Sequence, residues 1–390
     1  MRIAMVTRRF WPLVGGAEMA MANLASEFRD RGHRITLLTA RWEPSWPSEI
    51  RHRDIPVVRL AQPRGRGWGT FVYLRALTRR LVEMRDEVDL VFVSMLKHDA
   101  YAAVASRHRH HLPVVIRAEG GGATGDCHWH EEGRFGRRIR RTTTLADAHV
   151  APSPAVADEM IAAGYDPRRL RTIENGVPVQ PERRPEDRRR ARAALSELHP
   201  ALVAADHEPL AVYTGRLHPG KGLAELVDAW PAVLRRRPEA RLWLVGEGEF
   251  ERELRMMIRE RELQEHVLLP GTFDDVGDVL SAADLFVLPS HHEGLSLALL
   301  EAMAAELPVV ATEIPGNCRV VRDGVQGKLV PVRDPGAIAA AVLALLDDPE
   351  GRLRMGRAAR RTAADEHSIG AMASAHLELF EQVLSSREAR

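Results

Sequence analysis

Residues 283–304 read ADLFVLPSHHEGLSLALLEAMA, and this one stretch combines the signals of a strand, a polar loop and a helix. Leu285–Leu288 is a continuous apolar run, which is typical of a strand buried on both faces of a parallel sheet. A polar loop with Glu293 and Gly294 follows, and a helix is expected from Leu297. We therefore expect a βα unit whose polar loop lies at the carboxyl end of the strand.

Short apolar runs alternate with segments of helical period along both halves of the chain. This pattern predicts two doubly wound α/β domains, in which ligands bind outside the carboxyl ends of the strands. Strands are expected at 2–7, 34–39, 89–94, 113–117, 149–151, 210–214, 241–245, 267–269, 285–288, 308–311 and 328–330.

A proline-punctuated, charge-dense stretch over 178–191, PVQPERRPEDRRRA, has no apolar periodicity and is typical of a linker that enters a helix. The length of 390 residues also favours two domains over one. We expect a first domain over 1–180, completed by a C-terminal helix over 366–390, and a second domain over 181–365.

Composition excludes several classes of protein. No apolar run approaches the roughly 20 residues that a membrane-spanning helix needs. The two cysteines, Cys127 and Cys318, form no CxxC pair, which excludes a disulfide scaffold and suits a reducing cytosol. No export signal is apparent in the first residues. We expect a cytoplasmic protein.

Charge is unevenly distributed along the chain. Residues 1–180 hold 28 basic and 20 acidic side chains, a net of +8, although the whole chain carries only +1. The basic stretch Arg134–Arg141 lies in this half. An anionic partner, such as a phosphorylated acceptor or the inner face of a membrane, and a solvated arginine-rich surface both fit these charges. No nucleic-acid-binding module is evident, so nucleic acid is not an expected partner.

The stretch VYTGRLHPGKGL, residues 212–223, leads from a strand through a glycine-bounded turn into a helix. It places Arg216 and Lys221 where an anion fits between a guanidinium fork and an ammonium point charge, as a diphosphate would. Either cation alone is typical of a surface salt bridge. The pair around a glycine-rich turn favours an anion site, and the spacing does not match a P-loop.

Two further loops carry candidate groups. In 283–304, Glu293 and Glu301 are suited to accept hydrogen bonds from sugar or ribose hydroxyls. Glu301 taken alone also fits a glutamate that only caps its helix or lies on the helix surface. The amides that begin the helix favour phosphate. In PLVGGAE, residues 12–18, Gly15 and Gly16 allow backbone amides to approach a ligand, but an ordinary βα turn fits equally.

Taken together, these motifs resemble glycosyltransferase family 4, the glycosyl transferases group 1. The resemblance rests on GGAE at 15–18, on Gly215-Arg216 with Lys221-Gly222, on LVGEG at 244–248 and on 283–303, and it spans nearly the whole chain. It implies a GT-B fold, with two Rossmann-like domains that face each other across a cleft, and a retaining transfer of a sugar from a nucleotide diphosphate to an acceptor hydroxyl.

The resemblance also implies residue roles. Arg216 and Lys221 would grip the diphosphate of a UDP- or GDP-sugar, Glu293 would contact the donor sugar, and Glu301 the ribose. The remaining donor contacts would come from Gly15, Gly16, Gly294, Leu295 and Ser296. The nucleobase of the donor would lie against Gly271, Thr272 and Phe273. No cofactor and no metal are expected.

One departure from the family pattern bears on the sugar site. Family members commonly have a histidine where this chain has Glu119, which could hydrogen-bond a hydroxyl or act as a base. The glycine-rich segment after it, residues 120–130, is expected to be a mobile loop in which Asp126 and His128 are acceptor-side candidates. We therefore expect Glu293, Arg216, Lys221 and Glu119 to carry the chemistry.

Two other functions are compatible with the same residues. A sugar-nucleotide epimerase on a similar fold would act on the donor without an acceptor. A non-catalytic nucleotide-sugar-binding protein would bind the donor without turnover. The acceptor, whether a glycan, a lipid-linked sugar or a small molecule, is left open by the sequence.

Overall fold

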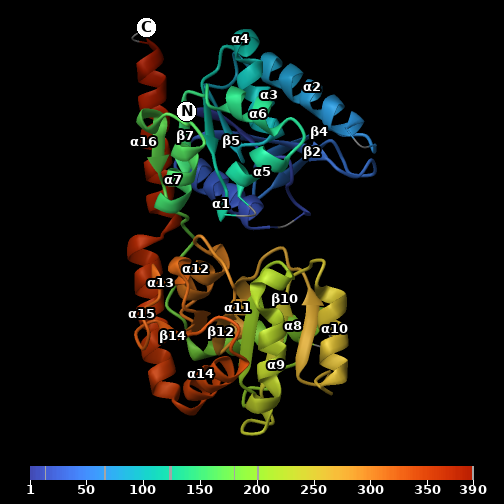
Figure 1. Cartoon of the computed structure of the whole chain (residues 1–390), viewed down its shortest axis with the longest axis vertical. Coiled ribbons are helices and arrows are strands. Elements are labelled where there is room, and N and C mark those ends of the chain that lie inside the picture. Colours follow the sequence, from blue (N-terminus) through green and yellow to red (C-terminus); the bar gives the residue numbers. More distant parts are fainter. Residues whose placement is uncertain (14, 66, 123–124, 180, 200–201, 389–390) are drawn as a thin grey trace. The chain divides into compact units, whose positions relative to one another are not determined.

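The computed structural model describes residues 1–13, 15–65, 67–122, 125–179, 181–199 and 202–388 (Figure 1). Contacts divide the chain into two compact units. Unit 1 consists of Met1–Asn175 together with Ile369–Arg390, and unit 2 consists of Gly176–Ser368. The sequence alone placed these boundaries at 180/181 and 365/366.

Unit 1 contains an eight-stranded sheet with the order β3-β4-β2-β1-β5-β6-β7-β8 among the described residues. Every neighbouring pair is parallel except β3 and β4. The strands are β1 (Arg2–Val6), β2 (Arg34–Arg41), β3 (Glu49–His52), β4 (Ile55–Ala61), β5 (Leu90–Ser94), β6 (Val114–Arg117), β7 (Ala148–Ala151) and β8 (Leu170–Thr172).

Successive side chains of a strand point to opposite faces of the sheet, so a continuous apolar strand leaves apolar side chains on both faces. Helices cover both faces of this sheet. Ile3 of β1 packs in one core cluster with Phe28 and Phe380, whereas Ala4 beside it belongs to another cluster with Leu77. The helical segments of unit 1 are α1 (Gly16–Asp30), α2 (Trp68–Glu83), α3 (His98–Ala105), α4 (Arg107–His110), α5 (Asp126–Glu132), α6 (Gly136–Thr143), α7 (Pro154–Ala162), η2 (Pro167–Arg169) and α16 (Ile369–Glu388).

The C-terminal helix α16 is part of unit 1 although it follows unit 2 in sequence. It packs beside α1, and the rings of Phe28 and Phe380 lie 5.8 Å apart. His376 of α16 is fully buried between these rings and Phe92. The end of the chain therefore completes one face of the first sheet.

Unit 2 contains a six-stranded sheet, parallel throughout, with the order β11-β10-β9-β12-β13-β14 among the described residues. Its strands are β9 (Leu210–Thr214), β10 (Arg241–Val245), β11 (Val267–Gly271), β12 (Leu285–Leu288), β13 (Val309–Thr312) and β14 (Gly327–Val330). Its helical segments are α8 (Pro185–Leu198), η4 (Pro219–Lys221), α9 (Leu223–Leu234), α10 (Glu251–Glu260), α11 (Gly277–Ala282), α12 (Leu297–Ala304), α13 (Pro315–Cys318), α14 (Pro335–Asp347) and α15 (Pro349–Glu366).

The two doubly wound α/β units confirm the fold class expected from the sequence. The predicted strands at 210–214, 241–245 and 285–288 have the observed bounds. The hairpin β3–β4 and the edge strand β8 were not expected. β3 has the sequence EIRH and lacks the continuous apolar run that marks a buried strand, and none of its residues is buried.

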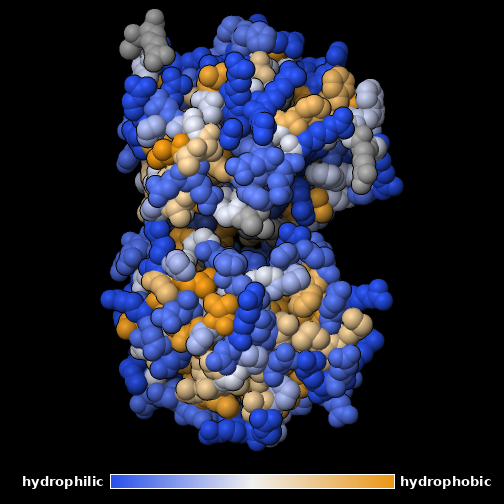
Figure 2. Space-filling model, in the orientation of Figure 1, coloured by the Kyte–Doolittle hydropathy of each residue, from blue (hydrophilic) through white to orange (hydrophobic). Residues whose placement is uncertain are grey.

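No helix among the described residues is both long and apolar enough to cross a membrane. The face of the molecule in Figure 2 is mostly hydrophilic, and apolar side chains occur there only in small groups.

Candidate active site

Four loops of unit 2 meet at the carboxyl edge of its sheet, after β9, β10, β12 and β13. Glycines make their contact possible. A Cβ on Gly222, whose φ is +67°, would lie 1.9 Å from the carbonyl oxygen of Pro289. A Cβ on Gly246 would lie 1.8 Å from the carbonyl oxygen of Gly215, and its φ of +144° also disfavours a side chain. The loops therefore brace one another.

Lys221 and Glu293 form an ion pair between two of these loops. The Lys221 Nζ lies 2.5 Å from Glu293 Oε1, and the side chains are 29% and 11% exposed. Ser290 Oγ donates to the same carboxylate oxygen at 2.8 Å. The backbone amide of His291 donates to the carbonyl of Gly220 and joins the same two loops. The Lys221 ammonium and the Glu293 carboxylate are thus held together by contacts within unit 2.

Tyr213 lies beneath this pair at the end of β9. It is fully buried, and its hydroxyl donates to the carbonyl of Arg216 at 2.9 Å, which fixes the start of the turn. Burial raises the pKa of Tyr213, and the negative charge of Glu293 adds to the increase. The phenol therefore stays neutral and acts as a hydrogen-bond donor to the backbone.

Arg216 is held more loosely than Lys221. Its guanidinium donates to both carboxylate oxygens of Glu249, at 2.9 and 3.2 Å, but the two side chains are 67% and 50% exposed. His218 also lies 3.4 Å from Glu249. An exposed pair of this kind contributes little stability, so an anionic ligand can replace Glu249 at small cost.

The loop after β12 carries the other predicted donor contacts. A Cβ added to Gly294 would meet no neighbouring atom of the described residues within 4 Å, and the following Leu295 is anchored in the core. Ser296 is the N-cap of α12, where its hydroxyl accepts from the amide of Leu299. Glu301 follows in the second turn of α12. Helix-start amides and two carboxylates are thereby grouped at this edge of the sheet.

The segment Gly271-Thr272-Phe273, which is predicted to contact the nucleobase, lies at the carboxyl end of β11, on the same edge. The amide of Gly246 donates to the carbonyl of Gly271 at 2.8 Å, which ties this turn to the loop after β10. Asn317, in the short helix after β13, is fully buried and donates to the carbonyl of Thr312. Its amide therefore stabilises the packing of the loop after β13.

In unit 1, Gly15 and Gly16 stand at the start of α1, beyond the carboxyl end of β1, as the sequence predicts. Glu18 in the first turn of α1 is mostly buried, and its carboxylate lies 3.8 Å from the Arg9 guanidinium. Desolvation raises the pKa of Glu18. A carboxylate of α1 itself, that of Glu18, therefore lies in the first turn of the helix, where Gly15 and Gly16 are predicted to contact the donor.

Glu119 lies just beyond the carboxyl end of β6, and its side chain is only 9% exposed. Ser94 Oγ, at the end of the adjacent strand β5, donates to Glu119 Oε1 at 2.8 Å, and the buried Arg117 guanidinium lies 3.6 Å from the same oxygen. Burial raises the pKa of Glu119 to about 7, although Arg117 and Ser94 oppose the increase, and the nearby Asp126 and Glu18 add to it. This carboxyl can therefore gain or lose a proton near neutral pH.

The segment after Glu119 differs from the mobile loop that the sequence suggests. From Asp126 it forms the helix α5, with Gly125 as N-cap; Ala123 and Thr124 lie outside the described residues. Asp126 is only 3% exposed, because its carboxylate accepts from the amide of Glu119 at 3.0 Å and lies 3.5 Å from Lys97 Nζ.

The two acceptor-side candidates consequently have different environments. Asp126 is buried and supports the backbone at Glu119, so it acts on the site through that residue. His128 on α5 is more accessible, with 38% of its side chain exposed, and lies 3.4 Å from Glu132. The basic stretch Arg134–Arg141 forms most of α6, and four of its arginines are exposed, as is Phe135 at 61%.

Sequence reasoning missed the residues that hold the candidates in place. Ser290 lies in the 283–304 segment, yet only the structure shows that its hydroxyl donates to Glu293. Glu249 follows the glycine turn at 246–248, and Ser94 ends a predicted strand. The available signal for each of them was a polar residue at, or within a few residues of, the end of a buried strand.

Comparison with known proteins agrees with the two-unit fold. Residues 14–181 match the family described as Glycosyltransferase Family 4, and residues 196–362 match the family described as Glycosyl transferases group 1. The chain belongs to glycosyltransferase family 4. Its two Rossmann-like units are those of the GT-B fold.

Individual relatives differ in how much of the chain they match. The alpha-D-kanosaminyltransferase of Streptomyces kanamyceticus is 32% identical over 43% of this chain, and the match spans 44% of that relative's length. The glycogen synthase of Mycobacterium tuberculosis is 27% identical over 97% of the chain and 94% of its own length. The crystal structure of Anabaena HepE in complex with UDP and glucose matches with a TM-score of 0.74 and 20% identity, covering 97% of this chain and 99% of that one.

Proposed function

We propose that this protein is a retaining glycosyltransferase that transfers a sugar from a UDP- or GDP-sugar to an acceptor hydroxyl without a metal ion. The observation that carries the proposal is the Lys221–Glu293 pair, braced between two glycine turns at the carboxyl edge of the second sheet. One loop pair there presents a cation suited to phosphate and a carboxylate suited to sugar hydroxyls. Family membership supports the reaction class.

In this proposal the cations take the role that a metal has in other transferases. Lys221 and Arg216 bind the diphosphate and stabilise the negative charge that grows on it as the glycosidic bond breaks. Binding displaces Glu293 from Lys221 and Glu249 from Arg216. The released Glu293 carboxylate then accepts hydrogen bonds from the donor sugar, so donor binding prepares the sugar contact.

Other groups at the same edge complete the donor site. Amides at Leu295 and Ser296, at the start of α12, bind phosphate oxygens, and Glu301 accepts from the ribose hydroxyls. The base lies against Gly271-Thr272-Phe273. In unit 1, Glu119 hydrogen-bonds a sugar or acceptor hydroxyl, and its pKa of about 7 allows it to serve as acceptor or donor near neutral pH.

The proposed chemical step keeps the configuration of the anomeric carbon. The bond from that carbon to the phosphate oxygen breaks, and a bond from the same carbon to the acceptor oxygen forms on the same face. The proton of the acceptor hydroxyl passes to the departing phosphate. The products are a glycoside and a nucleoside diphosphate, and no other reactant is required.

A donor panel tests the proposal. Purified protein is incubated with UDP- and GDP-sugars and a set of hydroxyl acceptors, with and without EDTA, and the anomeric configuration of the product is read by NMR. We expect a product with the donor's configuration and unchanged turnover in EDTA. An inverted product contradicts retention, and activity that EDTA abolishes and a divalent ion restores contradicts the metal-free step.

The same assay separates the two other functions that the sequence left open. Isomerised donor formed without an acceptor would identify an epimerase. Thermal stabilisation by a nucleotide sugar with no turnover on any acceptor would identify a binding protein, since a ligand that binds only the folded state raises its apparent stability.

A further inference from the structure

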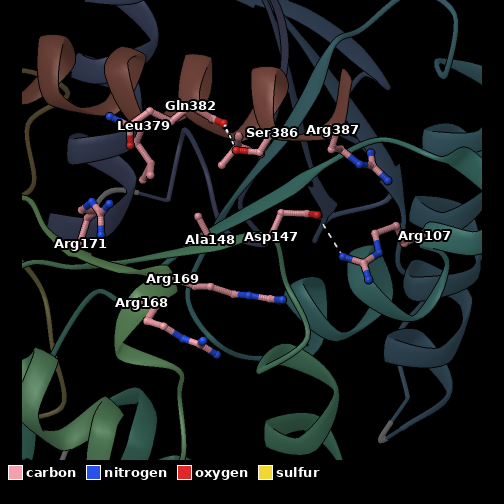
Figure 3. A pocket seen from close by; sticks show the side chains of 11 residues that line it. Arg107, Asp147, Ala148, Arg168, Arg169, Arg171, Leu379, Gln382, Ser386 and Arg387 are labelled. Atoms are coloured by element: carbon pink, nitrogen blue, oxygen red, sulfur yellow. Dashed lines mark hydrogen bonds and ion pairs between the residues drawn. The ribbon is translucent and has the colours of Figure 1, made fainter. Parts of the chain in front are cut away.

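A cavity of about 540 Å³ in unit 1 is lined by five arginines (Figure 3). It lies between the beginnings of β7 and β8 and the last turns of α16. In Figure 3 the arginine side chains surround Asp147 and Ala148. The five are Arg107, Arg168, Arg169, Arg171 and Arg387, and Asp147 is the carboxylate among the lining residues. We call this feature the arginine cavity.

The cavity is remote from the candidate groups of the same unit. Parallel strands begin at one edge of a sheet and end at the other. Ala148 begins β7 and Leu170 begins β8, whereas Glu119 lies just beyond the end of β6. The arginine cavity and Glu119 therefore lie at opposite edges of the first sheet, so a ligand in this cavity would be separate from the donor and acceptor of the proposed function.

Two of the five guanidinium groups already have carboxylate partners. Arg107 lies 3.1 Å from Asp147, whose second role is to accept from the amide of Val114. Arg168 lies 3.0 Å from Asp166. These pairs occupy Asp147 and Asp166 and leave three cations to consider.

In the described part of the chain, the other three guanidinium groups pair only with backbone carbonyls. Arg169 donates to Ala146 O at 3.2 Å, Arg171 to Leu170 O at 3.3 Å, and Arg387 to His111 O at 2.6 Å. A carbonyl accepts a hydrogen bond but carries no full negative charge. Among the described residues, three positive charges thus share one concave surface without an ion-paired partner, and each guanidinium keeps donors for another acceptor.

We propose that the arginine cavity binds the phosphate groups of a small anionic ligand, either a free diphosphate or phosphate ester or a phospholipid head group. Guanidinium forks match phosphate oxygens in pairs, which favours phosphate over a monovalent inorganic ion. The volume suits a ligand larger than one phosphate. Leu379 and Val383 of α16 add an apolar wall against which a carbon skeleton packs.

Binding of inorganic pyrophosphate to the full chain tests the proposal by calorimetry. The key variant is Arg169→Gln/Arg171→Gln, whose side chains are exposed and make no ion pair with a described residue, so folding is retained. The matched control, Arg75→Gln/Arg79→Gln, removes the same charge from exposed positions of α2 in the same unit. Because pyrophosphate is also expected at the donor site, Lys221→Ala is measured in parallel.

Besides the donor site, we expect a salt-sensitive pyrophosphate site that persists in Lys221→Ala and in the α2 control. This site should weaken at least about tenfold in Arg169→Gln/Arg171→Gln, since hydrogen bonds to charged groups are the strong ones. Equal binding by the cavity variant and the control overturns the proposal. So does the absence of any pyrophosphate site in Lys221→Ala. A melting curve of each variant verifies that it is folded.

Co-sedimentation with vesicles distinguishes the two sources of phosphate. Vesicles of phosphatidylcholine are compared with vesicles of equal parts phosphatidylcholine and phosphatidylglycerol. If the cavity variant alone loses binding to the anionic vesicles, the ligand is a lipid head group. If it binds them as the wild type does while losing pyrophosphate, the ligand is a free phosphate compound. Both results support the cavity, provided that the pyrophosphate result holds.

Discussion

Glu293 and Glu119 are two glutamates at the carboxyl edges of two similar parallel sheets, yet their surroundings differ in kind. Glu293 has an ammonium 2.5 Å away and is held between two loops of its own unit. Glu119 has no ammonium partner among the described residues, but a guanidinium at 3.6 Å and a hydroxyl at 2.8 Å. The charge of Glu293 is balanced by Lys221, whereas for Glu119 burial outweighs the partners and raises its pKa to about 7.

The comparison shows that position in a doubly wound fold selects which residues meet a ligand, while local packing selects what each can do. A paired carboxylate whose partner also binds phosphate responds to the ligand. A buried carboxyl with a pKa near 7 responds to protons. We therefore expect perturbations of the first to act on donor use and perturbations of the second to act on pH dependence.

The largest expected effect is that of Lys221→Ala. The variant removes the cation that the proposal places on the diphosphate and leaves Glu293 without its partner. Turnover should fall by roughly 100-fold or more, the scale for loss of one charge-stabilising group. Steady-state kinetics with the best donor measure it. Arg216→Ala, which removes a more exposed cation, is the companion variant.

Near-normal turnover of Lys221→Ala would contradict the assignment of the anion site. A large increase in KM with unchanged kcat would instead show that Lys221 binds the ground state and the transition state equally. Glu350→Ala is a suitable control, because its exposed carboxylate pairs with Arg354 on the same helix, α15, outside the four loops of the candidate site.

A smaller effect is expected from the glycines that brace the Glu293 loop. Gly222→Ala places a Cβ 1.9 Å from the carbonyl of Pro289 at a φ of +67°, so the backbone must move. We expect a loss of about 1–3 kcal/mol in the free energy of unfolding, together with weaker nucleotide binding. Chemical denaturation measures the first and thermal shift with UDP or GDP the second.

Gly294→Ala is the matched control for this variant. It lies in the facing loop, has no positive φ, and its added Cβ would meet no neighbouring atom of the described residues within 4 Å. Its unfolding free energy should stay within about 0.5 kcal/mol of the wild type. Equal destabilisation by the two alanines would show that the glycine turns do not brace the site in the way that the structure indicates.

Much of unit 2 was predictable from sequence because its strands are continuous apolar runs. The same signal failed for β3, whose residues alternate at an exposed edge, and for α5, where Gly125 and Asp126 begin a helix inside a segment that composition marks as a loop. The candidate site residues could also be identified from local sequence, since polar residues follow buried strands at the edge of the sheet where ligands bind.

The pairing of those groups was not predictable. Lys221 and Glu293 are 72 positions apart and meet only because β9 and β12 are neighbours in the sheet. The environment of Glu119 depends on Ser94, Arg117 and Asp126, which come from three separate segments. A raised pKa requires knowledge of burial, and one sequence provides no measure of burial at a single glutamate.

The smallest expected effect is a change of pH dependence in Glu119→Gln. If Glu119 acts as a hydrogen-bond acceptor or base, wild-type kcat/KM should rise roughly tenfold between about pH 6 and pH 8, as a group with a pKa of about 7 ionises. The variant should lack this rise. Stability should change in the opposite direction, because the folded state holds a proton that the unfolded chain releases.

The sign of the stability effect follows from the raised pKa. Between the ordinary glutamate pKa of about 4.3 and about 7, the folded state binds more protons than the unfolded chain, so the contribution of Glu119 to stability declines as pH rises. Asp99→Asn is the control, since burial also raises the pKa of Asp99 to about 7, and the groups that act on it, Arg8 and Tyr73, differ from those that act on Glu119. Both variants should lose part of the decline in melting temperature over this range, but only Glu119→Gln should flatten the profile of kcat/KM. An activity profile that flattens equally in both variants would mean that the pH dependence reports folding, and that Glu119 has no direct part in the reaction.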